Sequence, residues 1–128
     1  MIYLDTHAVV WLYAKELDRF TEKGLESLDA NELLMSPMVT LELEYLHETG
    51  RIQVKSRVIC ESLKQTVGLR VCELPFAAVA HVSLDQTWTR DPFDRLIVAQ
   101  AKLADAPLLT KDSIIIKHYK KAFWDSAT

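Results

Sequence analysis

Acidic residues follow two short apolar runs of this chain and lie in the first turn of one helical segment. Asp5 comes directly after Ile2-Tyr3-Leu4, and Asp112 comes two residues after Leu108-Leu109-Thr110. Asp94 lies near the start of a segment in which apolar residues recur at helical spacing. Each carboxylate could simply cap a helix, because Asp is a preferred N-cap residue and acids suit the first turn. Taken together, the three acids indicate a catalytic or metal-binding site rather than three separate helix caps.

Carboxylates that meet at one edge of a sheet repel one another. Two such charges about 4 Å apart cost roughly 4 kcal/mol at an effective dielectric constant near 20. Protonation, with a raised pKa, is one way to offset this cost. A hard divalent cation is the other, since carboxylate and water oxygens are its preferred ligands. The cation that fits is Mg²⁺ or Mn²⁺ rather than zinc, because the His and Cys residues do not cluster in the sequence.

A fourth acid comes from the middle of the chain, where two glutamates compete for the role. Glu42 and Glu44 lie in the same segment of helical spacing, two residues apart. Two residues correspond to about 200° around a helix, so the two side chains point in nearly opposite directions. Only one of them can point into a shared site, and the spacing alone does not say which.

Short apolar runs alternate with helical segments along the whole chain. This alternation predicts an α/β fold of three layers, with a short parallel sheet of about four to five strands and helices on both faces. The predicted strands are 2–4, 33–35, 69–74, 107–110 and 122–124, and the predicted helices are 7–14, 21–30, 40–49, 55–67, 76–84, 93–104 and 114–119. Function in such folds gathers at the carboxyl ends of the strands, where the acids lie.

Length and composition are those of one globular domain over residues 1–128. The chain is 49% hydrophobic and 26% charged, so a core can form without disulfides, and we expect Cys60 and Cys72 to be reduced thiols. No apolar run approaches the roughly 20 residues that span a bilayer, and the first residues lack the pattern of a signal peptide. We therefore expect a cytoplasmic protein without a membrane partner.

Four motifs occur in the order and spacing of a known family. They are Tyr3-Leu4-Asp5-Thr6-His7, Ser36-Pro37-Met38-Val39-Thr40-Leu41-Glu42, Arg90-Asp91-Pro92-Phe93-Asp94-Arg95-Leu96-Ile97-Val98-Ala99-Gln100-Ala101 and Leu108-Leu109-Thr110-Lys111-Asp112. Any one of them alone is a weak signal. All four in order make the chain resemble the PIN-domain ribonucleases and, within that family, the VapC-type toxins of prokaryotic toxin–antitoxin pairs.

The resemblance implies a Mg²⁺- or Mn²⁺-dependent endoribonuclease that hydrolyses RNA phosphodiester bonds. The acids that would be catalytic and hold the metal are Asp5, Glu42, Asp94 and Asp112. The resemblance selects Glu42 over Glu44, because the family's acid lies six residues after the serine that here is Ser36. Thr6 and Thr110 match hydroxyl positions that support the pocket, and Asp91 matches the cap of the helix that carries Asp94.

The resemblance also implies partners: an RNA substrate, a cognate antitoxin protein and a second copy of the chain in a homodimer. The net charge of −3 speaks against RNA at first sight. Without the four proposed pocket acids, however, the 18 acidic residues fall to 14 against 15 basic residues. The basic residues that we expect to contact RNA are Arg95, Lys111, Lys15 and Arg90. Unpaired bases could stack on Trp11, Tyr13, Trp88 or Trp124, although core packing is the commoner use of such residues.

Other classes of protein share parts of this pattern. A receiver-like phosphoacceptor domain would have a pair of acids after the first strand, where this chain supplies only Asp5. A phosphatase of the haloacid dehalogenase type would have a second Asp two residues after the first, where this chain has His7. A non-catalytic PIN-like module that binds RNA or protein remains the main alternative, and such modules tend to lose the acids that are all present here.

Overall fold

A five-stranded, fully parallel sheet forms the centre of the molecule. The computed structural model describes residues 1–125, and residues 126–128 of the predicted domain lie outside the described part. The strands lie in the order β3-β2-β1-β4-β5. Their bounds are β1 (Ile2–Leu4), β2 (Leu33–Met35), β3 (Arg70–Val71), β4 (Leu108–Leu109) and β5 (Ala122–Phe123). The predicted fold class is therefore confirmed.

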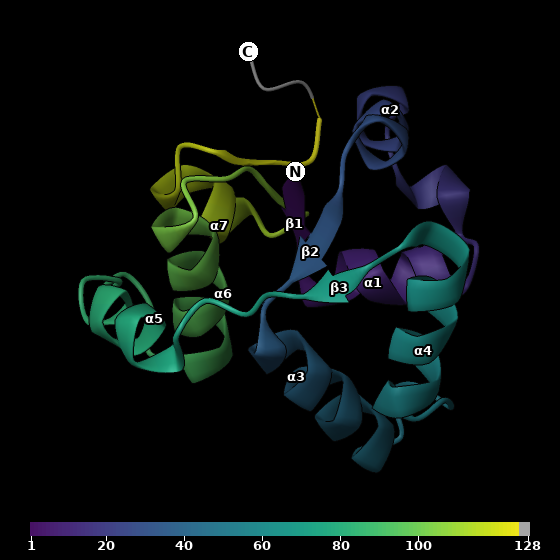
Figure 1. The fold of residues 1–128 in the computed structure, drawn as a ribbon, viewed down its shortest axis with the longest axis horizontal. Helices are drawn as coiled ribbons and strands as arrows, with labels where there is room; N and C mark the ends of the chain where they lie inside the picture. Colours follow the sequence, from purple (N-terminus) through teal and green to yellow (C-terminus); the bar gives the residue numbers. More distant parts are fainter. Residues whose placement is uncertain (126–128) are drawn as a thin grey trace.

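Helices cover both faces of the sheet, with α1, α2 and α4 on one side and α5, α6 and α7 on the other (Figure 1). The helices are α1 (Thr6–Tyr13), α2 (Glu22–Ala30), α3 (Pro37–Glu48), α4 (Ser56–Val67), α5 (Phe76–Ser83), α6 (Pro92–Leu103) and α7 (Ser113–His118), with a 3-10 turn η1 (Leu17–Arg19) after α1. Helix α3 packs against both α4 and α6 and so joins the two layers. No helix among the described residues combines the length and the apolar character that crossing a membrane requires.

The order of the strands reverses beside β1. The chain runs outward from β1 through β2 to β3 and then returns to the other side of β1 to form β4 and β5. Tyr3 consequently has Leu34 on one side and Leu108 on the other. Ligands of open α/β sheets bind at such a reversal, outside the carboxyl ends of the strands. Asp5 directly follows β1, and Asp112 lies three residues after the end of β4. Both predicted acids therefore lie at this edge of the sheet.

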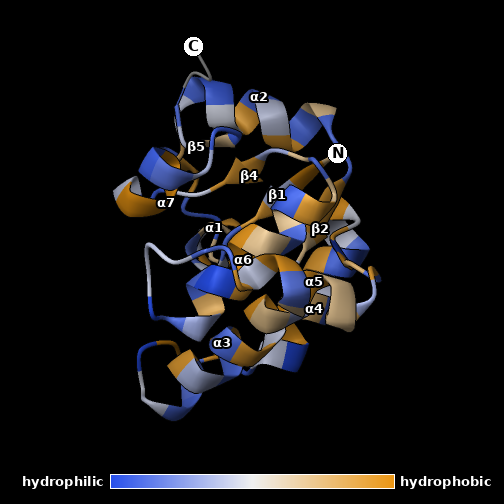
Figure 2. Ribbon diagram, turned by 90° about the vertical axis from the view of Figure 1, so that its left-hand side faces the viewer, coloured by the Kyte–Doolittle hydropathy of each residue, from blue (hydrophilic) through white to orange (hydrophobic). Residues whose placement is uncertain are grey.

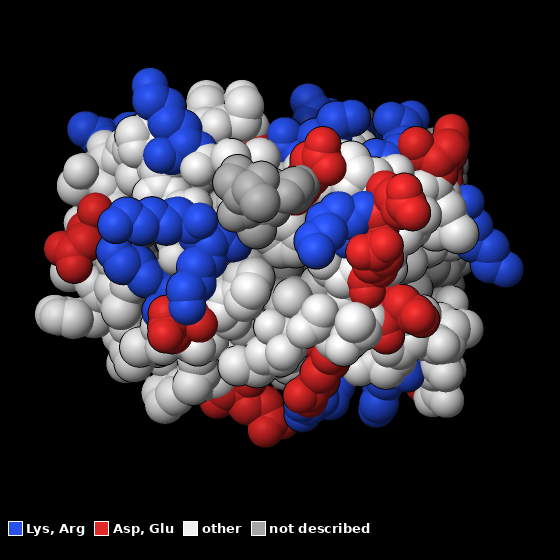
Figure 3. Space-filling view, turned by 90° about the horizontal axis from the view of Figure 1, so that it is seen from above, with Lys and Arg blue, Asp and Glu red and all other residues white. Residues whose placement is uncertain are grey.

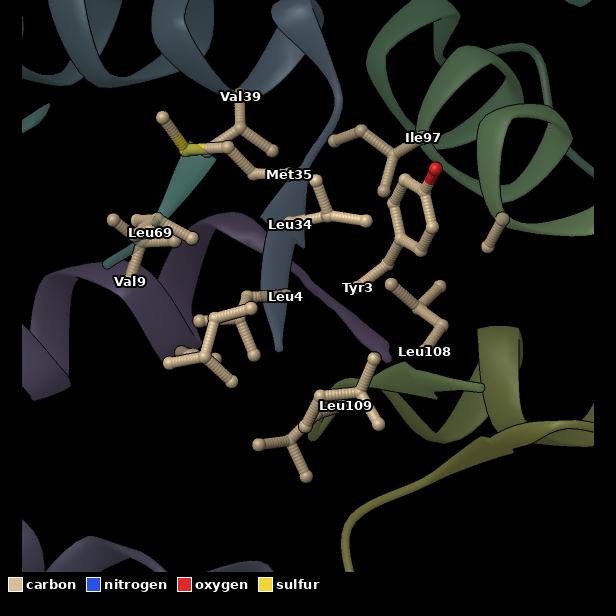
Figure 4. Close-up of a cluster of buried hydrophobic side chains, with 14 of the residues drawn as sticks. Tyr3, Leu4, Val9, Leu34, Met35, Val39, Leu69, Ile97, Leu108 and Leu109 are labelled. Carbon is tan, nitrogen blue, oxygen red and sulfur yellow. The ribbon is translucent and has the colours of Figure 1, made fainter. Parts of the chain in front are cut away.

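The central strand is buried on both faces, which fixes the position of everything attached to its end. The three residues of β1 are at most 3% exposed, as expected for a parallel sheet covered by helices. Figure 4 shows Tyr3 beside Ile97 of α6, whereas Leu4 lies on the side of Val9 of α1. Figure 2 shows the strands of the sheet coloured as hydrophobic and enclosed by helices that carry both polar and apolar residues.

Two predicted elements differ from the structure by three residues or more at one end. The helix predicted over 40–49 begins at Pro37, because the Ser36 side chain accepts a hydrogen bond from the Met38 N–H and proline is well suited to the first helical position. The strand predicted over 69–74 is reduced to Arg70–Val71 at the edge of the sheet. This edge strand has a neighbour on one side only, and Pro75, which lacks an N–H, precedes α5 soon after it.

Helix α4 ends at Gly68, whose φ of +73° lies in the left-handed region. A Cβ added there would meet no atom within 4 Å, so the cost of Gly68→Ala comes from the backbone alone. We expect a loss of about 1 kcal/mol in the free energy of unfolding, measured with urea. Gly24→Ala in helix α2 is the matched control and should cause no such loss. Equal stability of the two variants would contradict this account.

Candidate active site

The four predicted acids line one open cavity at the carboxyl edge of the sheet. Its volume is about 440 Å³. Its lining residues are Asp5, His7, Trp11, Glu42, Asp91, Asp94, Lys111 and Asp112. The acids come from four separate parts of the chain, namely the end of β1, α3, α6 and the start of α7. The fold therefore brings together side chains that are up to 107 residues apart in the sequence.

Asp5 is the buried acid of the cavity. It directly follows β1 and is 8% exposed. Its Oδ1 accepts a hydrogen bond of 2.7 Å from the Thr6 N–H, and its Oδ2 accepts one of 2.6 Å from the Thr110 hydroxyl. Two donors thus hold the carboxylate in one orientation, and each oxygen keeps a lone pair for another ligand.

Glu42 and Glu44 point in opposite directions, as the helical geometry requires. The Glu42 carboxylate accepts a hydrogen bond from the Thr6 hydroxyl and lines the cavity. Glu44 instead accepts a hydrogen bond of 3.1 Å from the Ser56 N–H, at the start of α4. The Glu42 side chain of α3 therefore lies in the cavity, whereas the Glu44 side chain binds the first residue of α4.

Asp91 caps the helix that carries Asp94, as the sequence predicts. Its Oδ1 accepts hydrogen bonds from the N–H groups of Phe93, at 2.8 Å, and Asp94, at 3.4 Å. Asp91 also lines the cavity, so it adds to the negative charge there. No hydrogen bond among residues 1–125 reaches the Asp94 carboxylate, in contrast to Asp5.

Asp112 is both a helix cap and a wall of the cavity. Its Oδ1 accepts hydrogen bonds from the Ile114 and Ile115 N–H groups of α7, so its Oδ2 is not used for capping. The Asp112 N–H donates to the Thr110 hydroxyl oxygen at 3.1 Å, and that hydroxyl donates to Asp5. Thr110, which is completely buried, thereby couples the positions of Asp5 and Asp112.

Burial and mutual repulsion raise the pKa of three cavity carboxyls. Burial raises the pKa of Asp94 to about 7, with further contributions from the charges of Asp91, Asp5, Asp112 and Glu42. Burial also raises the pKa of Asp5 and of Glu42. Hydrogen bonds from Thr110 and Thr6 to Asp5, and from Thr6 to Glu42, act in the opposite direction. The cavity therefore holds more negative charge than its own donors neutralise.

The donor set of the cavity fits a hard divalent cation. Carboxylate oxygens dominate it, whereas no thiol lines it and His7 is its one imidazole. Within residues 1–125, no three His, Cys, Asp or Glu side chains converge closely enough to ligate one ion by themselves. A loose ring of carboxylates suits Mg²⁺ or Mn²⁺, because such ions commonly keep several water ligands beside one or two protein carboxylates. The residues that could hold the ion are Asp5, Glu42, Asp94 and Asp112.

Of the four basic residues predicted to contact RNA, Lys111 alone lines the cavity. The Arg95 Nε donates a hydrogen bond of 2.8 Å to the Gln86 carbonyl and ties α6 to the preceding loop. The Arg90 Nη1 donates to the Thr87 carbonyl. Lys15 is exposed, with a φ of +58°, and lies outside the cavity lining.

The sequence suggests Trp11 only as one of four aromatic residues that could stack on RNA bases, and it indicates no role for His7 in the site. Both line the cavity, and both lie on α1, which begins directly after Asp5. They are four residues apart and hence on one face of the helix, with ring centroids separated by 5.7 Å. The signal that could have found them is this helical spacing, read from the acid that precedes the helix.

A family model for the PIN domain matches residues 2–121. The chain belongs to the PIN-domain family. This PIN domain is also 31% identical over 123 residues to Ribonuclease VapC22 of Mycobacterium tuberculosis (strain ATCC 25618 / H37Rv), a match that covers 91% of each protein. The predicted resemblance to the PIN domains, and to VapC proteins among them, is thus confirmed.

Two solved structures share the PIN-domain fold with this chain. The structure of VapBC2 from Rickettsia felis, bound to a DNA fragment from its promoter, matches with a TM-score of 0.67 and 22% identity over 98% of this chain and 100% of that chain. The structure of FitAcB from Neisseria gonorrhoeae matches with a TM-score of 0.51 and 20% identity over 98% and 97% of the two chains. At these identities the matches establish the fold.

The raised pKa of Asp94 predicts how stability depends on pH in the absence of metal. In the folded protein this carboxyl keeps its proton up to about pH 7, whereas its ordinary pKa is 3.8. The folded state then binds more protons than the unfolded state between these values, so stability falls as the pH rises through this window.

Asp94→Asn removes the ionisable group and should flatten that fall. Because the side chain is only half-buried, solvent screening limits the variant's gain in the free energy of unfolding at pH 8 to about 1–2 kcal/mol. Below pH 4 the variant and the parent should be equally stable. Urea unfolding in a chelator between pH 4 and 8 measures both. A difference between the two proteins that does not change with pH would contradict the prediction.

Proposed function

We propose that this PIN domain is a VapC-type toxin: a Mg²⁺- or Mn²⁺-dependent endoribonuclease of the cytoplasm that hydrolyses RNA phosphodiester bonds. The observation that carries the proposal is the single cavity lined by Asp5, Glu42, Asp94 and Asp112. The similarity to a protein named as a ribonuclease, over nearly the full length of both, supports it. A receiver-like function has no comparable support, because Asp5 is the one acid that directly follows β1.

Asp5 and Asp94 are proposed as the direct ligands of the cation, with Glu42 and Asp112 acting through waters or at a second ion. When bound, such a cation supplies positive charge that lowers the pKa of a water and offsets the charge that builds on the phosphate. Every other role falls to the chain itself.

Hydroxyl donors orient the carboxylates for this task. Thr110 fixes Asp5, and Thr6 fixes Glu42, so the two acids keep their directions without a bound ligand. Lys111 supplies the positive charge at the cavity that an RNA phosphate needs. Protonation of Asp94 in the free protein means that binding of a cation should release a proton near neutral pH.

The proposed partners are a cognate antitoxin and a second copy of the chain. A structural neighbour of this chain is VapBC2 in complex with DNA from its promoter, which supports the proposal of an antitoxin partner. The homodimer is carried over from the family resemblance.

Glu42 and Glu44 offer a matched pair for testing the cavity. Glu42→Gln should lower the rate of Mn²⁺-dependent RNA cleavage by about 10- to 100-fold, because it removes a cavity charge while leaving an oxygen to accept from Thr6. Glu44→Gln should leave the rate within about twofold, because its partner is the Ser56 N–H outside the cavity. Cleavage of a bulk RNA pool measures both. Equal rates for the two variants would contradict the placement of the site.

Calorimetric titration with Mn²⁺ tests the metal separately from cleavage. The parent protein should bind Mn²⁺ and release protons, and Asp5→Asn and Asp94→Asn should each weaken binding by about 10-fold or more. Melting temperatures in a chelator serve as the control for folding. Unchanged Mn²⁺ affinity in both variants, or RNA cleavage by Asp5→Asn at the parental rate, would overturn the assignment.

A further inference from the structure

Three aromatic side chains from separate segments meet at the wall of the acidic cavity. Trp11 of α1 forms T-shaped contacts with Phe20, at 6.5 Å between centroids, and with Trp124, at 5.5 Å. Phe20 and Trp124 stack on each other at 4.9 Å. Phe20 and Trp124 are buried, whereas Trp11 is partly exposed and lines the cavity. The buried pair therefore packs against Trp11, whose remaining surface faces the cavity.

Two cations lie over the Trp11 ring. The Arg19 guanidinium carbon is 5.1 Å from the ring centroid, and the Lys111 Nζ is 5.7 Å from it. The Lys111 Nζ is also 5.9 Å from the ring of Trp124. Cations at these distances interact favourably with the electron-rich face of an indole.

Lys111 lies beside a cavity with five carboxylates and yet forms no ion pair with any acid among residues 1–125. An ammonium group drawn only by charge would move toward the carboxylates. Its position over the indoles leaves the carboxylates open to a cation and keeps a positive charge at the margin of the cavity.

Positive charge by itself does not locate such a site. Figure 3 shows Lys and Arg side chains in several groups on the face that carries α2 and the N-terminus, with acidic side chains beside them. Those groups lie away from the carboxyl edge of the sheet. What distinguishes Trp11 is the combination of an aromatic ring packed on two buried aromatic side chains, two cations over that ring and a place in the lining of the acidic cavity.

We propose that Trp11 is the stacking surface for one unpaired base of the substrate, with Lys111 and Arg19 binding the phosphates that flank it. The proposal rests on the proposed ribonuclease function and adds the residues that would hold one nucleotide beside the acidic cavity. In the free protein the two cations cover the ring. An incoming base replaces them on the ring, and they turn to the phosphates of the same nucleotide.

The chemistry of stacking selects single strands, because the bases of a duplex are paired and stacked with one another. Stacking on a protein aromatic ring contributes about 1–3 kcal/mol per base, irrespective of its identity. The sub-site therefore favours loops and unpaired segments over helices, and it does not by itself select a sequence.

A comparison of two probes separates stacking from charge. One is a fluorescein-labelled oligouridylate, and the other is an abasic ribose-phosphate chain of the same length, which has the charges and no bases. Binding is measured with Mg²⁺ in an Asp94→Asn background, so that cleavage does not consume the probes. We expect the parent to bind the oligouridylate about 5- to 100-fold more tightly than the abasic chain.

Trp11→Leu should reduce that ratio to within about twofold, and Trp11→Phe should retain much of it, because phenylalanine keeps an aromatic face. Tyr13→Leu is the matched control on the same helix, where Tyr13 lies about 200° around the axis from Trp11 and outside the cavity lining. It should leave the ratio unchanged. An undiminished ratio in Trp11→Leu would overturn the proposal.

Fluorescence provides a second test that does not depend on the stability of Trp11→Leu. Oligouridylate, and not the abasic chain, should quench the tryptophan emission of the parent, and this quenching should be lost in Trp11→Phe. Quenching that persists in Trp11→Phe would overturn the proposal.

Salt dependence tests the cations. Lys111→Gln should reduce the slope of log K against log salt by about 0.7, the value for one contact with a phosphate of single-stranded RNA. An unchanged slope would overturn the assignment of Lys111.

Cleavage by the unaltered chain keeps the two proposals apart. Base-dependent binding through Trp11 without any RNA cleavage would contradict the proposed ribonuclease function and support the stacking site. RNA cleavage by the unaltered chain, together with a preference for oligouridylate over the abasic chain that is unchanged in Trp11→Leu, would overturn the stacking site alone.

Discussion

Repulsion among carboxylates at one edge of the sheet is the constraint on which the rest of this structure depends. Asp5 is placed there because β1 is central and buried, and the reversal of strand order beside β1 brings Asp112 to the same edge. Helices α3 and α6 add Glu42 and Asp94. A fold that only had to be stable would not concentrate these charges, since each raises the cost of ionising its neighbours. The pKa of Asp94 is raised to about 7, first by burial and then by the charges of these neighbours.

The chain offsets part of this cost with its own donors. Asp5, Asp91 and Asp112 each accept hydrogen bonds from backbone N–H groups at the start of a helix. For Asp91 and Asp112 these bonds go to Oδ1, and Oδ2 is not used for capping. Capping and ligand binding are therefore compatible roles of the same carboxylate. Helix capping holds the acids in place, and the remaining charge is what a cation would neutralise.

Much of this arrangement could be predicted from the sequence, because it follows from local patterns. Apolar runs separated by helical segments give the parallel sheet, and acids directly after strands 2–4 and 107–110 must lie at its carboxyl edge. The choice of Glu42 over Glu44 needed the family resemblance, since spacing shows only that the two diverge. The start of α3 was misplaced because Pro37 marks the end of a strand and equally the first turn of a helix.

Other features could not be predicted because they depend on side-chain direction. Arg95 is next to Asp94 in the sequence, yet its Nε donates to the Gln86 carbonyl, since adjacent residues on a helix point about 100° apart. Lys111 is next to Asp112 and turns instead toward the rings of Trp11 and Trp124. Trp11 and Trp124 lie near opposite ends of the described chain, so no local pattern in the sequence predicts their contact.

The titration of Asp94 tests the central claim most directly. Its carboxyl carbon can be followed by NMR, with Asp94→Asn identifying the signal, in a chelator and again with saturating Mg²⁺. The account predicts a pKa of about 7 in the chelator and a marked fall when Mg²⁺ binds, because the cation neutralises the surrounding carboxylates. A pKa near 4 in both conditions would show that the carboxylates neither repel one another strongly nor share a cation, and would contradict the account.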